Sequence, residues 1–360
     1  MEMTELKEAV YKEEKPDLKS MLLPELAEWV KAAGQPAFRA KQLYQWMHQK
    51  LARSLDEMTN LPAAFRKQLA EEAVFTTIEQ VQVQISKLDG TRKYLFELSD
   101  GNLIESVLMR YHHGNSVCIS SQAGCRMGCR FCASTIDGLA RSLTPAEMLE
   151  QIYQIQRETG ERVSNVVIMG SGEPMDNYTN VVRFLHLISA EEGLNISERN
   201  LTVSTCGLVP QMYRFAEEGL HCTLALSLHA PNDEVRRTLM PIANRYSLSE
   251  VLPACANYFK KTGRRVTFEY SLVAGVNDNK EEAAALAALV GHLNCHVNLI
   301  PVNPVKERSY RPSDRQNIEA FQKLLEKSGI NVTIRREMGR DIDGACGQLR
   351  RSFVEKESHS

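Results

Sequence analysis

The sequence predicts an α/β protein whose largest part is an incomplete barrel of (β/α)6 type. From about residue 115, short β-branched segments alternate with amphipathic helical segments, which favours a parallel sheet with helices outside it. About six such units are too few for a closed eight-stranded barrel. The strand candidates in this part are SVCIS, NVVIMG, LTVSTC, CTLALSL, RVTFEYSLV, HVNLIP and NVTIRR.

Two smaller regions precede the barrel. LPELAEWVKAAG, which ends on Gly34, and FRAKQLYQWMHQKL have the apolar spacing of helices, so we expect a small N-terminal helical domain. The strand-like segment TTIEQVQVQIS follows, and the pairs Asp89-Gly90 and Asp100-Gly101 indicate hairpin turns. The predicted divisions are 1–76 (helical accessory domain), 77–110 (strand and hairpin extension), 111–341 (barrel core) and 342–360 (C-terminal segment).

The composition is that of an ordinary globular protein, with 43% hydrophobic and 24% charged residues. No apolar run approaches the roughly 20 residues needed to cross a bilayer, and the charged start lacks a secretory apolar stretch. We therefore expect a cytoplasmic protein with no membrane partner, in which the nine cysteines favour metal binding or catalysis over structural disulfides. A net charge of −2 neither predicts nor excludes a nucleic-acid partner.

Residues that could take part in catalysis or ligand binding follow the predicted strands in an ordered way. In barrels of this kind the active site lies at the C-terminal ends of the strands. The agreement between that rule and the positions of these residues predicts one shared site. They are Cys125 after the first strand, Gly170 to Pro174 after the second, Ser204 and Thr205 on the third, Ser227 and His229 on the fourth, and Asn303 after the sixth.

The segment GCRMGCRFCAS carries three cysteines spaced so that one short loop can surround a metal centre. Structural zinc sites usually have four ligands, often in two close pairs, and no nearby CxxC completes such a set here. Three thiolates suit a cubane iron–sulfur cluster with one open iron, although such clusters commonly take four cysteines. The spacing by itself leaves both the cluster and a zinc knuckle open.

CRMGCRFC, with Phe131 before its last cysteine, resembles the CxxxCxxC signature of radical S-adenosylmethionine (SAM) enzymes. Seven segments in order resemble, more narrowly, the RlmN/Cfr family of RNA methyltransferases and its RlmN branch. The resemblance covers nearly the whole chain, including the helical N-terminal region. The segments are CISSQAGCRMGCRFCAS, GSGEPMDNY, VSTCGLVP, LALSLHAPND, RRTLMPI, VNLIPVNP and DIDGACGQL.

The resemblance implies a radical SAM barrel and methylation of carbon-2 of an adenosine in 23S rRNA and of the adenosine 3′ of the anticodon in certain tRNAs. It implies a 4Fe–4S cluster bound by Cys125, Cys129 and Cys132, with one iron open for SAM, and two SAM molecules per turnover. It further implies RNA binding by the N-terminal domain and a flavodoxin-like electron donor.

Three residues would act on the RNA if the resemblance holds. Cys346, in DIDGACGQL, matches the cysteine that carries the methyl group, and Cys118 matches the thiol that resolves the protein–RNA adduct by forming a disulfide. Glu105 matches the general base proposed for the family. Without the resemblance, Cys118 would be a buried strand residue and Glu105 a polar residue pointing outward from a strand.

The SAM site implied by the resemblance comes from the strand ends. Polar groups that end apolar strands are suited to an adenosyl pocket. The implied contacts are Gly172, Glu173, Ser204, Ser227, Leu228, His229 and Asn303.

Three other functions remain open on the sequence. A Cfr-type enzyme would methylate carbon-8 of the same ribosomal adenosine, but Pro174 gives the motif GEP of the RlmN branch where Cfr-type sequences have GEA. A nonenzymatic RNA-binding protein with a structural metal knuckle belongs to a different class, and it would not need polar residues at the strand ends. A radical SAM enzyme with another substrate is a further alternative.

Overall fold

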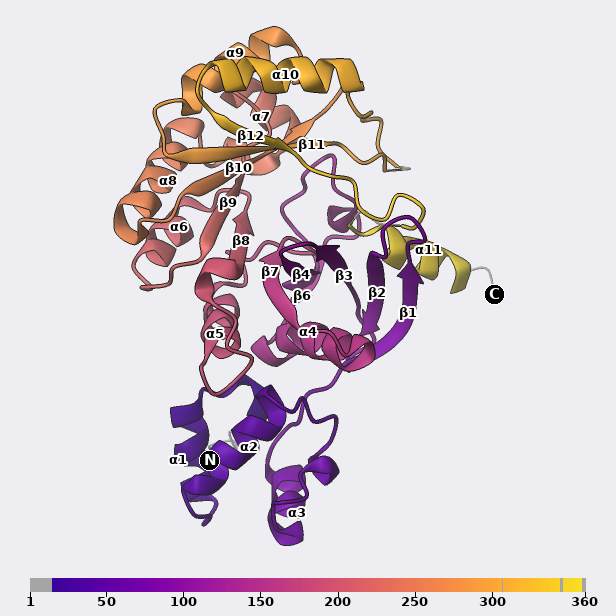
Figure 1. Ribbon diagram of the computed structural model, residues 1–360, viewed down its shortest axis with the longest axis vertical. Helices are drawn as coiled ribbons and strands as arrows, with labels where there is room; N and C mark the ends of the chain where they lie inside the picture. Colours follow the sequence, from indigo (N-terminus) through magenta and orange to yellow (C-terminus); the bar gives the residue numbers. More distant parts are fainter. Residues whose placement is uncertain (1–14, 306, 344–345, 358–360) are drawn as a thin grey trace, which may run out of the picture. The chain divides into compact units, whose positions relative to one another are not determined.

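The computed structural model describes residues 15–305, 307–343 and 346–357 (Figure 1). The chain forms two compact units, Met1–Thr76 and Thr77–Ser360. Among the described residues, no helix has the length and apolar character that a membrane span requires.

The first unit is helical, as the apolar spacing predicted. Its helices are α1 (Leu23–Ala32), α2 (Phe38–His48) and α3 (Ala63–Glu72), with 3-10 turns at Leu18–Ser20 and Leu55–Glu57. Gly34 has a φ of 74°, a conformation that side chains disfavour, and it directs the chain away from the end of α1. The buried residues of the three helices, which include Leu26, Leu43 and Phe65, lie on their apolar faces.

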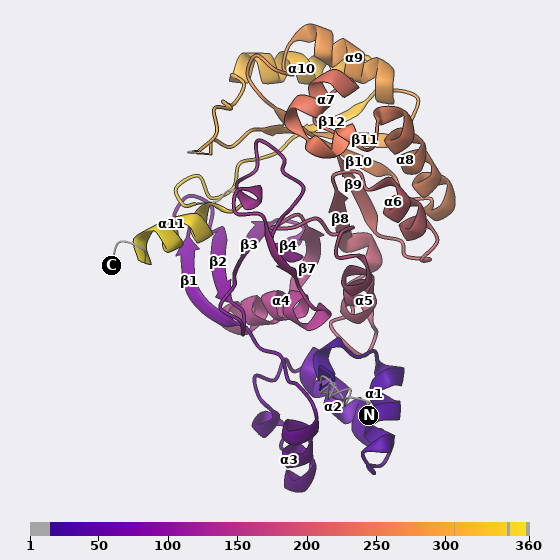
Figure 2. The same ribbon diagram turned by 180° about the vertical axis from the view of Figure 1, so that it is seen from behind.

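The second unit contains one ten-stranded sheet in the described part of the chain, in the order β1-β2-β3-β4-β7-β8-β9-β10-β11-β12 (Figure 2). The strands β1 to β4 pair antiparallel, with turns at Gly90 (φ 71°) and Gly101 (φ 79°), as the two Asp-Gly pairs predicted. The predicted extension is therefore continuous with the sheet of the barrel. These four strands are β1 (Glu79–Ile85), β2 (Arg92–Glu97), β3 (Leu103–Tyr111) and β4 (Gly114–Ile119).

From β4 onward every neighbouring pair in this sheet is parallel, and six strand–helix units followed by β12 form the partial barrel. The predicted fold class is thus confirmed. The further strands are β7 (Val163–Ile168), β8 (Leu201–Thr205), β9 (Thr223–Ser227), β10 (Val266–Leu272), β11 (Cys295–Pro301) and β12 (Asn331–Ile334). The helices are α4 (Pro145–Thr159), α5 (Tyr178–Ser189), α6 (Val209–Ala216), α7 (Asp233–Leu239), α8 (Leu248–Thr262), α9 (Lys280–Val290), α10 (Arg315–Lys327) and α11 (Gln348–Glu357).

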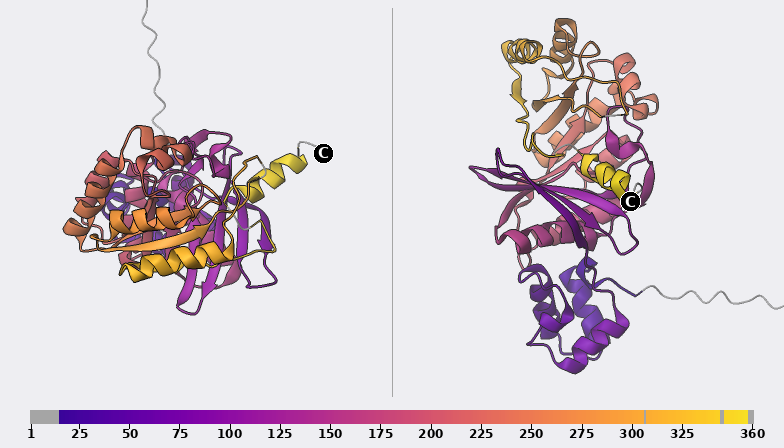
Figure 3. Two further views of the ribbon diagram at one scale, coloured as in Figure 1. Left: turned by 90° about the horizontal axis from the view of Figure 1, so that it is seen from above. Right: turned by 90° about the vertical axis from the view of Figure 1, so that its right-hand side faces the viewer.

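The register aligns the C-terminal ends of the parallel strands. Ile119 of β4 pairs with Ile168 of β7, and Ser227 of β9 pairs with Glu269 of β10. Since parallel strands run in one direction, the loops that follow them emerge at the same edge of the sheet. The last helix, α11, packs on β2 and β3, on the antiparallel side of the sheet (Figure 3).

Helix α4 shows how the sequence fixes a helix boundary. Thr144 accepts a hydrogen bond from the Glu147 amide (3.2 Å), and Glu147 Oε2 accepts one from the Thr144 amide (2.9 Å). This capping box satisfies donors that the first turn cannot satisfy itself. Gly160, with a φ of 67°, ends the helix.

We predict that Thr144→Ala lowers the free energy of unfolding by about 1 kcal/mol, because the amide of Glu147 loses its cap. Urea unfolding followed by circular dichroism measures the change. Thr179→Ala is the matched control, since Thr179 is exposed in the first turn of α5 and has no capping role there. The control should change the stability by no more than about 0.5 kcal/mol, and an equal loss in both variants would contradict the prediction.

Candidate active site at the strand ends

The cysteine loop begins after a short strand, β5 (Gln122–Gly124), and returns through β6 (Leu139–Ser142). The Cys125 amide donates to the carbonyl of Gly138 (2.8 Å), so the two ends of the loop are held together. Gly124 has a φ of 79°, and a Cβ there would lie 2.1 Å from the Gly138 oxygen. Only glycine therefore allows this closure.

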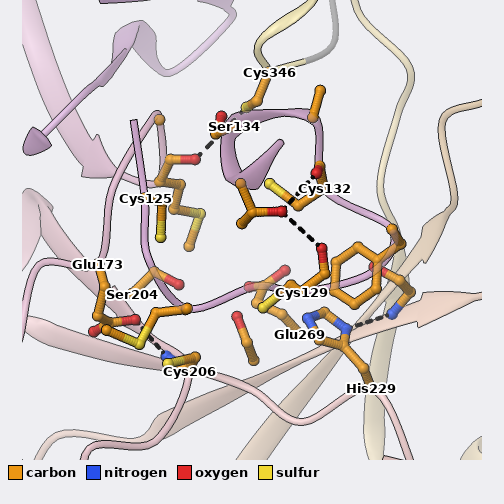
Figure 4. A pocket seen from close by; sticks show the side chains of 18 of the residues that line it. Cys125, Cys129, Cys132, Ser134, Glu173, Ser204, Cys206, His229, Glu269 and Cys346 are labelled. Atoms are coloured by element: carbon orange, nitrogen blue, oxygen red, sulfur yellow. Dashed lines mark hydrogen bonds between the residues drawn. The ribbon is translucent and has the colours of Figure 1, made fainter. Parts of the chain in front are cut away.

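The other two cysteines lie on a tight turn of the same loop. The amide of Cys132 donates to the Cys129 carbonyl (3.1 Å), and the Thr135 hydroxyl donates to the carbonyls of both cysteines (3.1 and 3.0 Å). The backbone of Arg130 is fixed to Leu239 (2.9 Å). These bonds hold the loop so that all three cysteines line one cavity (Figure 4).

The electrostatics of these thiols bear on what they can bind. Burial raises the pKa of Cys125 to about 12, and burial together with the neighbouring thiols also raises the pKa of Cys129 and of Cys132. Thiolates form here only if a cation replaces the protons, which is how a metal centre binds cysteine. The cavity therefore suits a positively charged centre.

The arrangement of the donors distinguishes a cluster from a single ion. Within residues 15–305, 307–343 and 346–357, no three His, Cys, Asp or Glu side chains are placed to hold one metal ion. In a cubane cluster each cysteine binds a different iron, so its thiolates need not converge on one point. Three thiols around one cavity therefore fit a 4Fe–4S cluster.

Two glycines form the wall of this cavity after β7. A Cβ on Gly170 would lie 2.7 Å from the Ile119 carbonyl, and one on Gly172 would lie 2.6 Å from Cβ of Gln122. Gly172 also has a φ of 109°, which other residues rarely adopt. The chain can approach β4 and β5 this closely only without side chains, and Glu173, which follows directly, lines the cavity.

Glu173 is buried and its carboxylate is oriented by the backbone. Oε2 accepts from the Cys206 amide (2.8 Å) and Oε1 from the Met175 amide (3.0 Å). Burial raises the pKa of Glu173, while these hydrogen bonds favour its charged form. A carboxylate held in this way can bind a cationic group of a ligand in the cavity.

The ends of β8 and β9 supply neutral polar groups. Ser204, Ser227, His229 and Asn303 line the same cavity as Gly172 and Glu173. Leu228 differs, because its side chain is fully buried and is not among the lining residues. A ligand contact at Leu228 would therefore involve its backbone.

His229 has a defined tautomer. It lies at a φ of 55°, and its Nδ1 accepts a hydrogen bond from the Ser271 amide (2.9 Å). Nδ1 is then unprotonated, so the neutral ring carries its proton on Nε2. Burial lowers the pKa of His229 to about 3, which keeps the ring neutral near pH 7. Phe131 contacts it edge to face, with ring centroids 4.8 Å apart.

Cys346 and Cys118 lie beside a second cavity that adjoins the first. Cys346 is exposed, lines both cavities and has its Sγ 3.7 Å from the Met169 carbonyl. Cys118, on β4, is buried and lines the second cavity. Burial and the proximity of Cys346 raise the pKa of Cys118 to about 12. Both cysteines are free thiols in this structure.

Glu105 does not line either cavity. It is only 6% exposed, so the alternative that it points outward from its strand is wrong. Its carboxylate forms an ion pair with Lys93 (2.9 Å) and accepts hydrogen bonds from the amides of Gly347 (2.6 Å) and Arg350 (2.7 Å). Glu105 therefore contacts the segment that carries Cys346.

Sequence reasoning missed three residues that line the first cavity, namely Glu269, Ser271 and Arg335, and it left the role of Cys206, which also lines this cavity, open. Glu269 is the most informative, because it is buried in the middle of β10, with its pKa raised by burial, and accepts from Asn298 (2.8 Å). A single charged residue in the run VTFEYSLV was the only signal in the sequence, and it marks the position as unusual without revealing its role.

Comparisons with known proteins agree with this geometry. Residues 119–287 match the model of the Radical SAM superfamily, and residues 16–75 match that of the Ribosomal RNA large subunit methyltransferase N-terminal domain. A crystal structure of a radical SAM methyltransferase from Sphaerobacter thermophilus has a TM-score of 0.89 and 43% identity, covering 92% of this chain and 98% of that chain.

Curated relatives are similar over nearly their whole length. A protein of Lachnospira eligens, named probable dual-specificity RNA methyltransferase RlmN, is 62% identical over 94% of this chain and 97% of its own. The protein of the same name from Lachnoclostridium phytofermentans is 61% identical over 95% and 96%. The resemblance drawn from the sequence motifs is thereby confirmed.

We predict that Gly172→Ala weakens SAM binding about tenfold or more, because a side chain at φ 109° is strained and its Cβ would meet Gln122. Equilibrium dialysis of the reconstituted protein with labelled SAM measures the affinity. Gly160→Ala is the matched control, since Gly160 also has a positive φ but has open space around it. Wild-type affinity in Gly172→Ala, or an equal loss in both variants, would show that this close approach does not shape the SAM site.

Proposed function

The chain belongs to the RlmN family of radical SAM RNA methyltransferases, and from that premise we propose that it methylates carbon-2 of adenosine. The proposed targets are an adenosine of the peptidyl transferase centre in 23S rRNA and the adenosine 3′ of the anticodon in certain tRNAs. The observation that carries the proposal is the position of Cys346, which lines both the cavity of the three-cysteine loop and the adjoining cavity of Cys118.

Cys125, Cys129 and Cys132 would hold the 4Fe–4S cluster, which supplies the electron that cleaves SAM to methionine and a 5′-deoxyadenosyl radical. Glu173 would bind the cationic amino group of SAM, because its buried carboxylate faces this cavity. His229 would donate from Nε2, and the backbone of Leu228 would contact the adenosyl group. The other proposed SAM contacts are Gly172, Ser204, Ser227 and Asn303.

Cys346 would carry the methyl group on its sulfur. A first SAM would methylate Sγ, which loses its proton while S-adenosylhomocysteine leaves. The 5′-deoxyadenosyl radical would then take one hydrogen atom from that methyl, which leaves a carbon radical joined to the protein. The ring carbon is an electrophilic amidine centre that cannot attack SAM as a nucleophile, whereas a carbon radical can add to it. Because Cys346 is exposed, its thiol would be accessible both to the first SAM and to the target adenine.

Cys118 and Glu105 would complete the transfer. Once the radical adduct has returned one electron to the cluster, Glu105 would accept the proton from the ring carbon. Cys118 would then give up its proton and attack Sγ of Cys346 to form a disulfide. The transferred carbon would keep the electron pair of the broken sulfur–carbon bond, and a proton from solvent would complete the methyl group. In this structure the carboxylate of Glu105 contacts Lys93 and the amides of Gly347 and Arg350. Glu105 would therefore have to give up one of these contacts in order to accept the proton.

The reaction requires partners that the sequence also predicts. The target base must leave its stack to reach the cavity, and we propose that the N-terminal helical unit contributes to RNA binding. A flavodoxin-like protein would supply the electrons. These substrates would place the enzyme in the cytoplasm. The membership in a methyltransferase family favours this proposal over a nonenzymatic protein with a metal knuckle.

We predict that the protein, reconstituted anaerobically with SAM and reductant, forms 2-methyladenosine in a 23S rRNA fragment and in tRNA. Mass spectrometry of the nucleosides, with standards for both isomers, identifies the product. Cys346→Ala should abolish it, because no sulfur remains to carry the methyl group. Cys295→Ala, at a buried cysteine of β11 outside both cavities, is the control and should retain activity.

Methylation at carbon-8 would move the protein to the Cfr-type alternative, which Pro174 in the GEP motif argues against. Cleavage of SAM without methylation of either RNA would contradict the proposed substrates. Product from Cys346→Ala would contradict the carrier role.

We further predict that Cys118→Ala accumulates a covalent protein–RNA adduct, because no thiol remains to release the sulfur of Cys346. Denaturing gel electrophoresis of the reaction with labelled RNA measures the retained fraction, which should greatly exceed that of the wild type. The same band should be missing from Cys118→Ala/Cys346→Ala. Normal turnover without an adduct in Cys118→Ala would remove Cys118 from the mechanism.

A further inference from the structure

The part of the chain around Cys346 is fastened to the antiparallel extension at successive points. We call its described residues, 339–343 and 346–350, the Cys346 segment. Along the β1–β2 hairpin, Asp89 accepts from the Gly339 amide (3.0 Å), and Asp341 accepts from Ser86 (2.6 Å) and the Lys87 amide (2.8 Å). The side chain of Gln84 forms two hydrogen bonds with Asp343, at 3.0 and 2.8 Å.

On the other side of Cys346, the segment is held by the carboxylate of a buried ion pair. Lys93 on β2 and Glu105 on β3 lie on one face of the sheet, and their side chains are 0% and 7% exposed. Glu105 Oε2 accepts from Lys93 Nζ (2.9 Å) and the Gly347 amide (2.6 Å), and Oε1 accepts from the Arg350 amide (2.7 Å). Both oxygens of Glu105 thus contact residues that directly follow Cys346.

A buried ion pair in a sheet is rarely the most stable choice, because removing two charges from water costs more than an apolar pair of the same size. Its presence calls for a role besides sheet stability. Glu105 has such a role here, since its charge is directed at two backbone amides that no helix bond satisfies at the start of α11. Lys93 pairs with that carboxylate and holds it toward these amides.

We propose that Lys93 and Glu105 are positioning residues that dock the Cys346 segment, and that the β1–β2 hairpin forms the rest of the dock. Docking holds the sulfur of Cys346 between the two cavities, within reach of the carbonyl of Met169. The antiparallel extension then has a function in the reaction: it holds the chain's own reactive thiol in place. This inference rests on the proposed function of Cys346 as the methyl carrier.

A variant of Lys93 can distinguish the docking role of this ion pair from the proton transfer proposed for Glu105. Glu105 is also the proposed base, so loss of activity in a Glu105 variant would fit either role. Lys93→Met removes the ammonium, keeps a long apolar side chain in the buried site and leaves the carboxyl group of Glu105 in place. Gln84→Ala weakens the dock at a half-buried position of β1, where a change cannot disturb the barrel core.

Hydrogen–deuterium exchange of the full, reconstituted enzyme tests the dock directly, because it reports local opening of named amides. In Lys93→Met, the amides of Gly347 and Arg350 should exchange about tenfold faster or more, since hydrogen bonds to a charged group typically shift an equilibrium by that factor. Gln84→Ala should accelerate exchange at Asp343. Amides of β2 and β3 should keep their wild-type rates, which a general loss of sheet stability would not allow.

Methylation of RNA, measured on the same preparations, should fall in Lys93→Met while the iron content and SAM affinity stay at wild-type values. The controls are Lys260→Met and Glu97→Gln, which make the same changes at exposed positions outside the dock and should leave exchange and activity unchanged. If Lys93→Met does not fold, Lys93→Met/Glu105→Gln removes both buried charges and should show the same faster exchange.

Unchanged exchange at Gly347 and Arg350 in the Lys93 variants would overturn the dock. Faster exchange with full methylation would overturn the positioning role, because the thiol would not need to be held. Neither result depends on the carrier role of Cys346, which Cys346→Ala tests separately. Product from Cys346→Ala would end the proposed function while leaving the exchange result as evidence of a dock.

Discussion

The parallel pairing that runs from β4 through β7 to β12 decides where this chain can carry out chemistry. Parallel strands end at one edge, so residues that follow different strands meet even though they are distant in sequence. Cys125, Glu173, Ser204 and His229 come from four such ends and line one cavity. An antiparallel arrangement of the same strands would have sent alternate ends to opposite edges. The cysteine loop would then have had no polar ligand pocket beside it.

Polar groups brought to that edge are buried, and the backbone of neighbouring strands fixes their orientation. Glu173 accepts from two amides, His229 accepts from the Ser271 amide, and Glu269 accepts from Asn298. A buried polar group without a partner is costly, so these bonds are required for stability as well as for geometry. The same bonds hold each side chain in place before a ligand arrives. Stability and preorganisation of the cavity therefore have one origin.

The sequence predicts the fold and much of the site for a physical reason. Alternating strands and helices are local patterns, and the topology then brings Gly172, Glu173, Ser204 and His229 together without further information. The features of the site that could not be predicted from the sequence depend on contacts between residues that are distant in the chain. Nothing near Glu105 in the sequence shows that Lys93 pairs with it or that Gly347 donates to it. Glu269 was missed because a single acid in an apolar strand reveals its role only when its neighbours are known.

Under the proposed function, Cys118 and Cys346 must not form a disulfide before the methyl group has been transferred. Burial and the nearby Cys346 both raise the pKa of Cys118, to about 12, so its thiol stays protonated and weakly nucleophilic near pH 7. When the sulfur of Cys346 is alkylated it can no longer become a thiolate, and its contribution to the raised pKa of Cys118 ends. Burial, the larger cause, remains, so the pKa of Cys118 falls only in part. In the proposed mechanism this environment would disfavour early attack by Cys118 and leave the exposed Cys346 to react first.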